Sequence, residues 1–178
     1  MDLTENTLES KLEYQGHIVT VRTDRVTLPN GGTATREVVS HPGGVAVVPL
    51  MEDGTVLMVR QYRYAFSQVL LEIPAGKLNP GEEPLPAAMR ELEEEAGVVP
   101  EELIDLGAIY PSPGFCDETL YLYLAKGLTR TFCHPDDDEF LEVEAIPLDA
   151  LIGQIMRNEL SDAKSVAALL KTHLFLKE

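Results

Sequence analysis

Basic residues are scarce in this chain. It has 14 lysines and arginines against 30 aspartates and glutamates, which gives a formal net charge of −16 at pH 7. Nucleic acids and anionic membrane surfaces are polyanions that attract basic proteins. The composition therefore argues against both as partners. Any anionic ligand would need metal ions and a few local arginines to reverse the repulsive field.

Long apolar runs and a secretory leader are also missing. No apolar run approaches about 18 residues, the length that predicts a membrane span. Residues 1–14 lack a basic region followed by an apolar core, so we expect no signal peptide. Two cysteines, Cys116 and Cys133, cannot build a disulfide framework, and no zinc-ligand spacing occurs. These absences favour a reducing, cytoplasmic location.

The apolar residues that are present predict an α/β fold. Runs typical of strands occupy residues 12–28, 45–50, 56–62, 69–73, 106–110, 120–125 and 140–146. Residues 148–156 and 163–176 have helical periodicity. Asn30-Gly31 is typical of a tight hairpin turn. We expect a mixed sheet between helices in a domain spanning residues 44–178, preceded by a small β-rich segment, residues 1–43.

Residues 76–98, GKLNPGEEPLPAAMRELEEEAGV, predict a loop followed by a helix. Pro84 suits the first turn of a helix, and Gly97 can end it in a left-handed conformation. Helical spacing then predicts one narrow buried stripe, made of Leu85, Ala88, Leu92 and Ala96.

The glutamates of this helix lie on another face. Glu91 and Glu95 are spaced i, i+4, where like charges destabilise a helix by about 0.2–0.5 kcal/mol. One interpretation is a solvated acidic surface. The other is a carboxylate cluster for Mg²⁺ or Mn²⁺, which are hard cations that prefer oxygen ligands.

A spaced pattern decides between the two interpretations. It consists of Gly76, Glu82, Arg90-Glu91-Leu92, Glu94-Glu95 and Gly97-Val98, and it resembles the Nudix box at every required position. The resemblance implies an α/β/α sandwich that hydrolyses a diphosphate linked to another moiety. It also implies metal binding by the Ala75 carbonyl, Glu91 and Glu95, with Glu94 binding metal or water nearby. Arg90 would orient these glutamates, and Glu82 would support the loop and helix.

Further motifs resemble the ADP-ribose pyrophosphatase subfamily. They are Val59-Arg60-Gln61-Tyr62-Arg63, Glu72-Ile73-Pro74-Ala75-Gly76, and Ser112-Pro113-Gly114-Phe115 with its following acids. This resemblance implies Mg²⁺-dependent hydrolysis of ADP-ribose to AMP and ribose 5-phosphate. Other nucleoside-diphosphate sugars such as GDP-mannose stay open as substrates. A non-catalytic nucleotide sensor is a third alternative, although such proteins tend to lose the box glutamates.

The subfamily also implies roles outside the box. Arg63 would contact phosphate, and Pro113, Phe115 and Glu118 would bind substrate. A carboxylate of the acidic loop, Asp137 or Glu139, would take a proton from the attacking water, and Glu139 is also a candidate metal ligand. Arg36 would reach the substrate of a partner subunit in a homodimer. The competing interpretation of each is an ordinary surface turn or surface charge.

Overall fold

The computed structural model describes residues 2–134 and 140–177. The chain forms two compact units. The N-terminal unit comprises Met1–Gly43 together with Tyr110–Thr119, and the main unit comprises Gly44–Ile109 and Leu120–Glu178. The first unit thus includes Tyr110–Thr119, which begins about seventy residues after the end of the expected N-terminal segment, residues 1–43.

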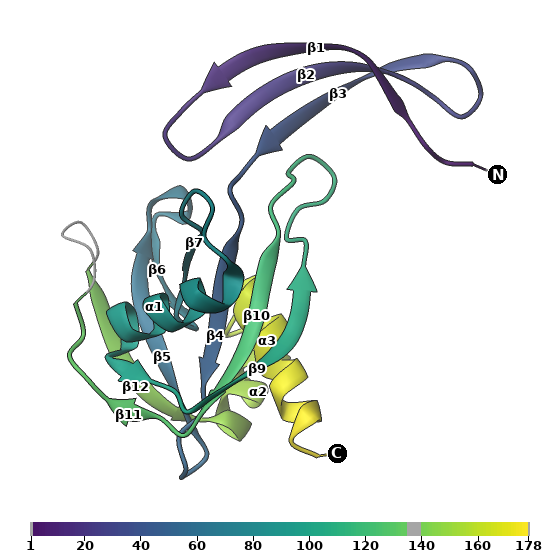
Figure 1. Ribbon diagram of the computed structural model, residues 1–178. Coiled ribbons are helices and arrows are strands. Elements are labelled where there is room, and N and C mark those ends of the chain that lie inside the picture. Colours follow the sequence, from purple (N-terminus) through teal and green to yellow (C-terminus); the bar gives the residue numbers. More distant parts are fainter. Residues whose placement is uncertain (1, 135–139, 178) are drawn as a thin grey trace. The chain divides into compact units, whose positions relative to one another are not determined.

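The N-terminal unit contains an antiparallel sheet of strands β1 (Asn6–Gln15), β2 (Thr20–Thr27) and β3 (Thr33–Ser40) (Figure 1). The expected single β run over residues 12–28 is wrong, because the chain turns between β1 and β2, where the Gly16 amide donates to the Val19 carbonyl. The hairpin between β2 and β3 is confirmed, and Gly31 has φ +84° at its turn.

The elements of the main unit follow the expected order. They are β4 (Gly44–Pro49), β5 (Thr55–Arg63), the 3₁₀ turn η1 (Tyr64–Phe66), β6 (Gln68–Glu72), β7 (Ala75–Lys77), α1 (Pro84–Ala96), β8 (Val98–Val99), β9 (Glu102–Ile109), β10 (Leu120–Lys126), β11 (Thr129–Arg130), β12 (Leu141–Pro147), α2 (Leu148–Met156) and α3 (Ala163–Phe175). The short strands β7, β8 and β11 were not predicted, since two or three residues show no periodicity.

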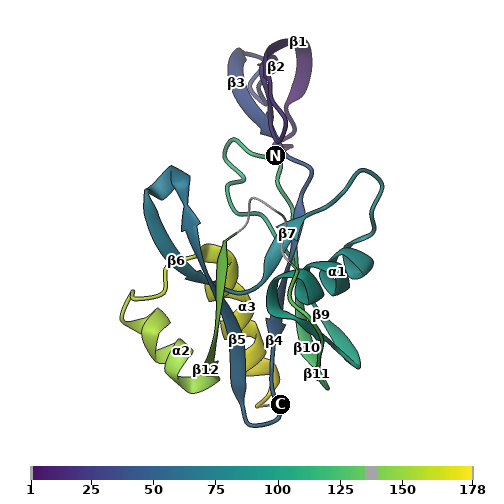
Figure 2. The ribbon, with the colours of Figure 1, turned by 90° about the vertical axis from the view of Figure 1, so that its left-hand side faces the viewer.

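The sheets of the main unit mix parallel and antiparallel pairs. One sheet has the order β7-β4-β10-β9, in which β10 runs parallel to β4 and antiparallel to β9. A second has the order β12-β5-β6, and β11 pairs with β8. Helix α1 lies on one side of β4, and α3 lies on the other (Figures 1 and 2).

Strand β4 is buried along its whole length because both of its faces are covered. Val45 and Val47 pack in one core cluster with Ala88 and Leu92 of α1. The alternate residues Ala46 and Val48 belong to another cluster, with apolar side chains of β10, α2 and α3. This two-sided packing confirms the expected mixed sheet between helices. None of the helices in the described part of the chain has the length and apolar character needed to cross a membrane.

Candidate active site

Helix α1 has the bounds that its sequence predicts. Pro84 is its first residue, and Gly97 caps its end with φ +60° while its amide donates to the Glu93 carbonyl. An alanine at this C-cap would be strained by the positive φ. Its Cβ would also approach the Cys133 amide nitrogen to 2.9 Å.

The buried face of α1 differs from the predicted stripe. Ala88 and Leu92 are buried as expected, but Leu85 is 48% exposed. The buried face instead includes Glu91 and Glu95, which are 8% and 2% exposed. A solvated acidic surface is therefore the wrong interpretation for these two carboxylates. Buried carboxylates require hydrogen-bonding or charged partners.

Strand β7 lies close against those two carboxylates. The Ala75 amide donates to Glu95 Oε2 at 2.9 Å. A Cβ added to Gly76 would come within 2.0–2.2 Å of the Glu91 carboxyl atoms. Glycine in a strand often marks such a close approach. The first glycine of the box is thus required by the space that Glu91 occupies.

Arg90 connects three glutamates of the box. Its Nε and Nη2 atoms donate to the two Glu82 oxygens at 2.9 Å each. Its Nη1 donates to Glu91 at 2.7 Å and to Glu94 at 2.9 Å. Such charge-assisted bonds are about twice as strong as neutral ones and fix the carboxylate directions.

Glu82 supports the loop that leads into the helix. Its hydrogen bonds from Arg90 and from the Asn79 amide lower the pKa of its carboxyl from 4.5 to about 2. The carboxylate is therefore charged throughout the neutral range and holds both the loop and Arg90. This geometry agrees with a supporting role.

Residues 131–134 bind the C-terminal end of α1. The Thr131 amide donates to the Gly97 carbonyl at 2.7 Å, and the His134 amide donates to the Glu94 carbonyl at 3.0 Å. The Cys133 thiol donates to the carbonyls of Glu94 and Glu95. Burial, followed by the charge of Glu95, raises the pKa of this thiol, which favours its protonated form. Asp137 and Glu139 lie outside the described residues, and their roles stay predictions.

Arg63, the predicted phosphate contact at the end of β5, forms a two-pronged ion pair with Glu72. Its Nε and Nη2 atoms donate to the two carboxylate oxygens at 2.7 Å each. Glu72 is only 1% exposed, whereas the Arg63 side chain is 39% exposed. Burial alone raises the pKa of Glu72, but the bonds and charges of Arg63 and Lys164 outweigh burial and lower it. Glu72 was not among the predicted site residues.

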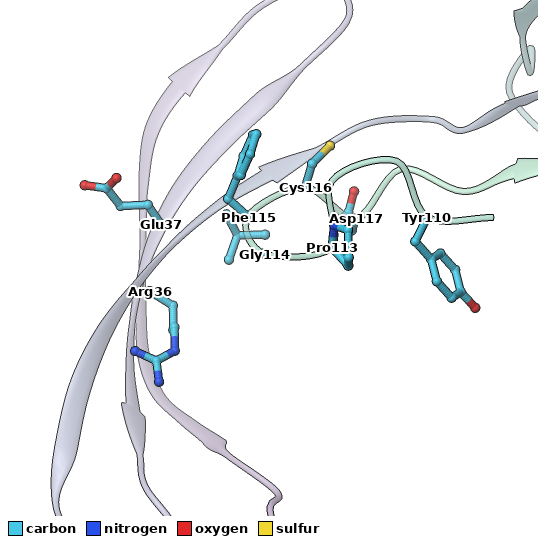
Figure 3. Close-up of a pocket in the computed structure, with 9 residues that line it drawn as sticks. Arg36, Glu37, Tyr110, Pro113, Gly114, Phe115, Cys116 and Asp117 are labelled. Carbon is cyan, nitrogen blue, oxygen red and sulfur yellow. The ribbon is translucent and has the colours of Figure 1, made fainter. Parts of the chain in front are cut away.

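Three of the other predicted substrate residues meet at a pocket of the N-terminal unit. A pocket of about 490 Å³ is lined by residues 36–38 of β3, by Tyr110 and by residues 113–117, and thus by Arg36, Pro113 and Phe115 (Figure 3). Arg36 is held by Glu5, at 2.9 and 2.5 Å. Glu118 does not line this pocket, and it lies 3.4 Å from the His41 ring nitrogen.

Backbone hydrogen bonds attach residues 110–119 to β3. The Val39 amide donates to the Phe115 carbonyl at 2.7 Å, and the Asp117 amide donates back to the Val39 carbonyl at 3.1 Å. The Asp117 carboxylate accepts from the Ser40 hydroxyl and the His41 amide. Two segments that are remote in sequence therefore form one pocket wall.

Comparison with known families matches residues 40–169 to the NUDIX domain model. This chain belongs to the Nudix family. Residues 5–39 match a second model, the nucleoside diphosphate sugar hydrolase N-terminal domain. The Nudix identification predicted from the box is confirmed, and the additional N-terminal region is itself a recognised domain.

Two curated relatives resemble the chain over nearly their whole length. It is 41% identical to a methanol dehydrogenase activator of Bacillus methanolicus, covering 93% of this chain and 90% of the relative. It is 39% identical to an ADP-ribose pyrophosphatase of Bacillus subtilis, covering 99% and 95%. A crystal structure of an ADP compounds hydrolase matches with a TM-score of 0.87 at 23% identity, covering 99% of this chain and 97% of that one. This match confirms the predicted Nudix fold.

Nudix hydrolases generally use divalent metal ions. Among residues 2–134 and 140–177, no three His, Cys, Asp or Glu side chains are arranged as a metal-binding group. The donors nevertheless have the right chemistry, because Glu91 and Glu95 offer carboxylate oxygens beside the β7 backbone. In this structure Arg90 and the Ala75 amide bind those oxygens instead.

Proposed function

We propose that this Nudix protein hydrolyses ADP-ribose to AMP and ribose 5-phosphate in a Mg²⁺-dependent reaction. The reaction class is supported by two buried glutamates held against β7 within a complete box. The substrate is supported by one observation above all, the 39% identity over nearly the full chain to a protein named ADP-ribose pyrophosphatase.

In this proposal Glu91, Glu95 and the Ala75 carbonyl hold the metal, and Glu139 adds a carboxylate. A bound Mg²⁺ would neutralise diphosphate charge and lower the pKa of the attacking water. Arg90 restrains Glu91 and Glu94 by the hydrogen bonds described above. The ion pair with Glu72 uses two of the five guanidinium N–H groups of Arg63. The other three would donate to diphosphate oxygens. Asp137 or Glu139 would accept the proton of the attacking water.

The pocket of the N-terminal unit would bind the nucleotide moiety. Tyr110 and Phe115 are 66% and 57% exposed and offer aromatic surface to a base. Arg36 would supply positive charge after exchanging Glu5 for the ligand. Glu118, on the same loop, would also bind the substrate.

A panel of nucleoside-diphosphate sugars tests the substrate. With Mg²⁺ present, ADP-ribose should be turned over with a kcat/KM at least about tenfold above that of GDP-mannose, giving AMP as judged by chromatography. Equal or reversed preference would leave the diphosphate hydrolase standing and refute ADP-ribose as the preferred substrate.

A second candidate function is activation of a dehydrogenase, favoured by the relative of 41% identity that bears the name methanol dehydrogenase activator. Adding this protein and its Glu95→Gln variant to a methanol dehydrogenase separates the two functions. Stimulation by wild type in the absence of ADP-ribose turnover would favour activation.

We also propose a homodimer in which the N-terminal unit contributes Arg36 to the partner's substrate site. Every described side chain of β1 is exposed, and a small sheet with little core is marginal alone. Mixed Arg36→Ala and Glu95→Gln chains should recover activity above either variant, because each heterodimer contains one intact site. A mass of 19.6 kDa in light scattering, which is the mass of one chain, would refute the homodimer.

A further inference from the structure

A group of charges around one buried glutamate links helix α3 to the strands that lead into the box. At its centre is Glu72, which is 1% exposed. Arg63 donates to both of its oxygens, and the Lys164 ammonium donates to Oε2. Lys164 also lies 3.0 Å from Asp162 Oδ2. Both cations therefore contact Glu72, Lys164 alone contacts Asp162, and the group of two cations and two carboxylates is neutral overall.

The first turn of α3 also binds the backbone next to Glu72. Asp162 caps the helix by accepting from the Ser165 amide at 3.0 Å and from its hydroxyl. The Ile73 amide in turn donates to the Ser165 hydroxyl oxygen at 2.9 Å. Helix α3 thus holds the side chain of Glu72 and the main chain of Ile73, close before Ala75.

The Lys164 ammonium has little access to a ligand, whereas the Arg63 guanidinium has more. The Lys164 side chain is 11% exposed, and both of its charged contacts are carboxylates. Arg63 is more exposed, and its pair with Glu72 uses two of the five guanidinium N–H groups. The Glu72 that holds Arg63 lies three residues before Ala75, whose amide donates to Glu95 of the box. The Glu72 bonds raise the pKa of Arg63, and the charge of Glu95 adds to this rise.

We propose that Lys164 is a positioning residue for diphosphate binding, because it shares the Glu72 carboxylate with Arg63 and so holds the guanidinium toward the substrate. This inference rests on the proposed function, in which Arg63 contacts the diphosphate. Without Lys164 the group would carry one net negative charge. Glu72 and Asp162 would then both attract Arg63, and an anionic substrate would be repelled.

Lys164→Met tests the idea, because methionine keeps an unbranched side chain and removes the charge. With Mg²⁺ saturating, the KM for ADP-ribose should rise about tenfold while kcat changes by less than about threefold. Lys171→Met is the matched control on the same helix: this lysine donates to the Leu106 carbonyl and contacts no member of the group. Its KM should equal that of wild type. Lys164→Arg should restore most of the affinity.

A double-mutant cycle with Arg63→Ala identifies the route of the effect. If Lys164 acts through Arg63, Lys164→Met should change KM by less than about twofold in the Arg63→Ala background. Multiplicative effects would overturn the inference, as would a lowered Tm with unchanged KM. If Lys164→Met does not fold, Lys164→Gln takes its place in the cycle.

The cycle also separates this inference from the function on which it rests. A raised KM in Arg63→Ala with an unchanged KM in Lys164→Met would refute the positioning role and leave the proposed site intact. An unchanged KM in Arg63→Ala would refute both the positioning role and the diphosphate contact of Arg63, and would leave ADP-ribose hydrolysis standing. No ADP-ribose hydrolysis by wild type would refute the proposed function itself, and with it this positioning role in ADP-ribose binding.

Discussion

Replacing Glu95 by glutamine should lower kcat/KM at least about a hundredfold while the protein stays folded. The side chain is 2% exposed, and its Oε2 accepts from the Ala75 amide at 2.9 Å. A glutamine carbonyl oxygen can keep that hydrogen bond, so we expect the variant to stay folded. Metal binding does depend on it, because an amide oxygen is a much weaker ligand than a carboxylate for a hard cation. Removal of one charge also relieves repulsion from Glu91.

Steady-state kinetics at saturating Mg²⁺ measure the loss of activity, a Mn²⁺ titration measures metal binding, and a thermal melt measures stability. Glu93→Gln is the matched control, because it makes the same chemical change on the same helix at a residue outside the buried face. A Glu95→Gln rate within threefold of wild type would refute the metal site. A Tm many degrees lower would point to a structural role instead.

Gly76→Ala should be nearly as damaging, although it adds a single methyl group. That methyl would overlap the Glu91 carboxyl at 2.0–2.2 Å, and Glu91 would have to leave β7 and its 2.7 Å bond to Arg90. Activity should fall about a hundredfold. Stability should change by no more than about 1–2 kcal/mol, because a flexible carboxylate moves and Gly76 does not have a positive φ.

Two variants isolate this mechanism. Gly153→Ala, in helix α2, meets only the end of the Arg157 side chain and should keep full activity. If Gly76→Ala acts by displacing Glu91, it should add almost nothing to the loss caused by Glu91→Gln. Independent, multiplicative losses would show that Gly76 acts in another way.

Features with local causes could be predicted from sequence. Pro84 and Gly97 bound the box helix because their backbone restrictions act within one turn. The Asn30-Gly31 hairpin follows from the positive φ that glycine accepts. The spaced glutamates and arginine identified the Nudix family for the same reason, since the box is one contiguous segment whose pattern can be read along the chain.

Other features depended on groups distant in the sequence. Helical spacing predicted that Leu85 would be buried, yet Glu91 and Glu95 are buried in place of it. Strand β7 and Arg90 satisfy their charges, and helix periodicity contains no information about such partners. Likewise Lys164 and Glu72 meet across 92 positions. Residues 110–119 join the N-terminal unit through hydrogen bonds to β3. Burying a charge is favourable only where the folded chain supplies its counter-charge, and that meeting is decided by tertiary packing.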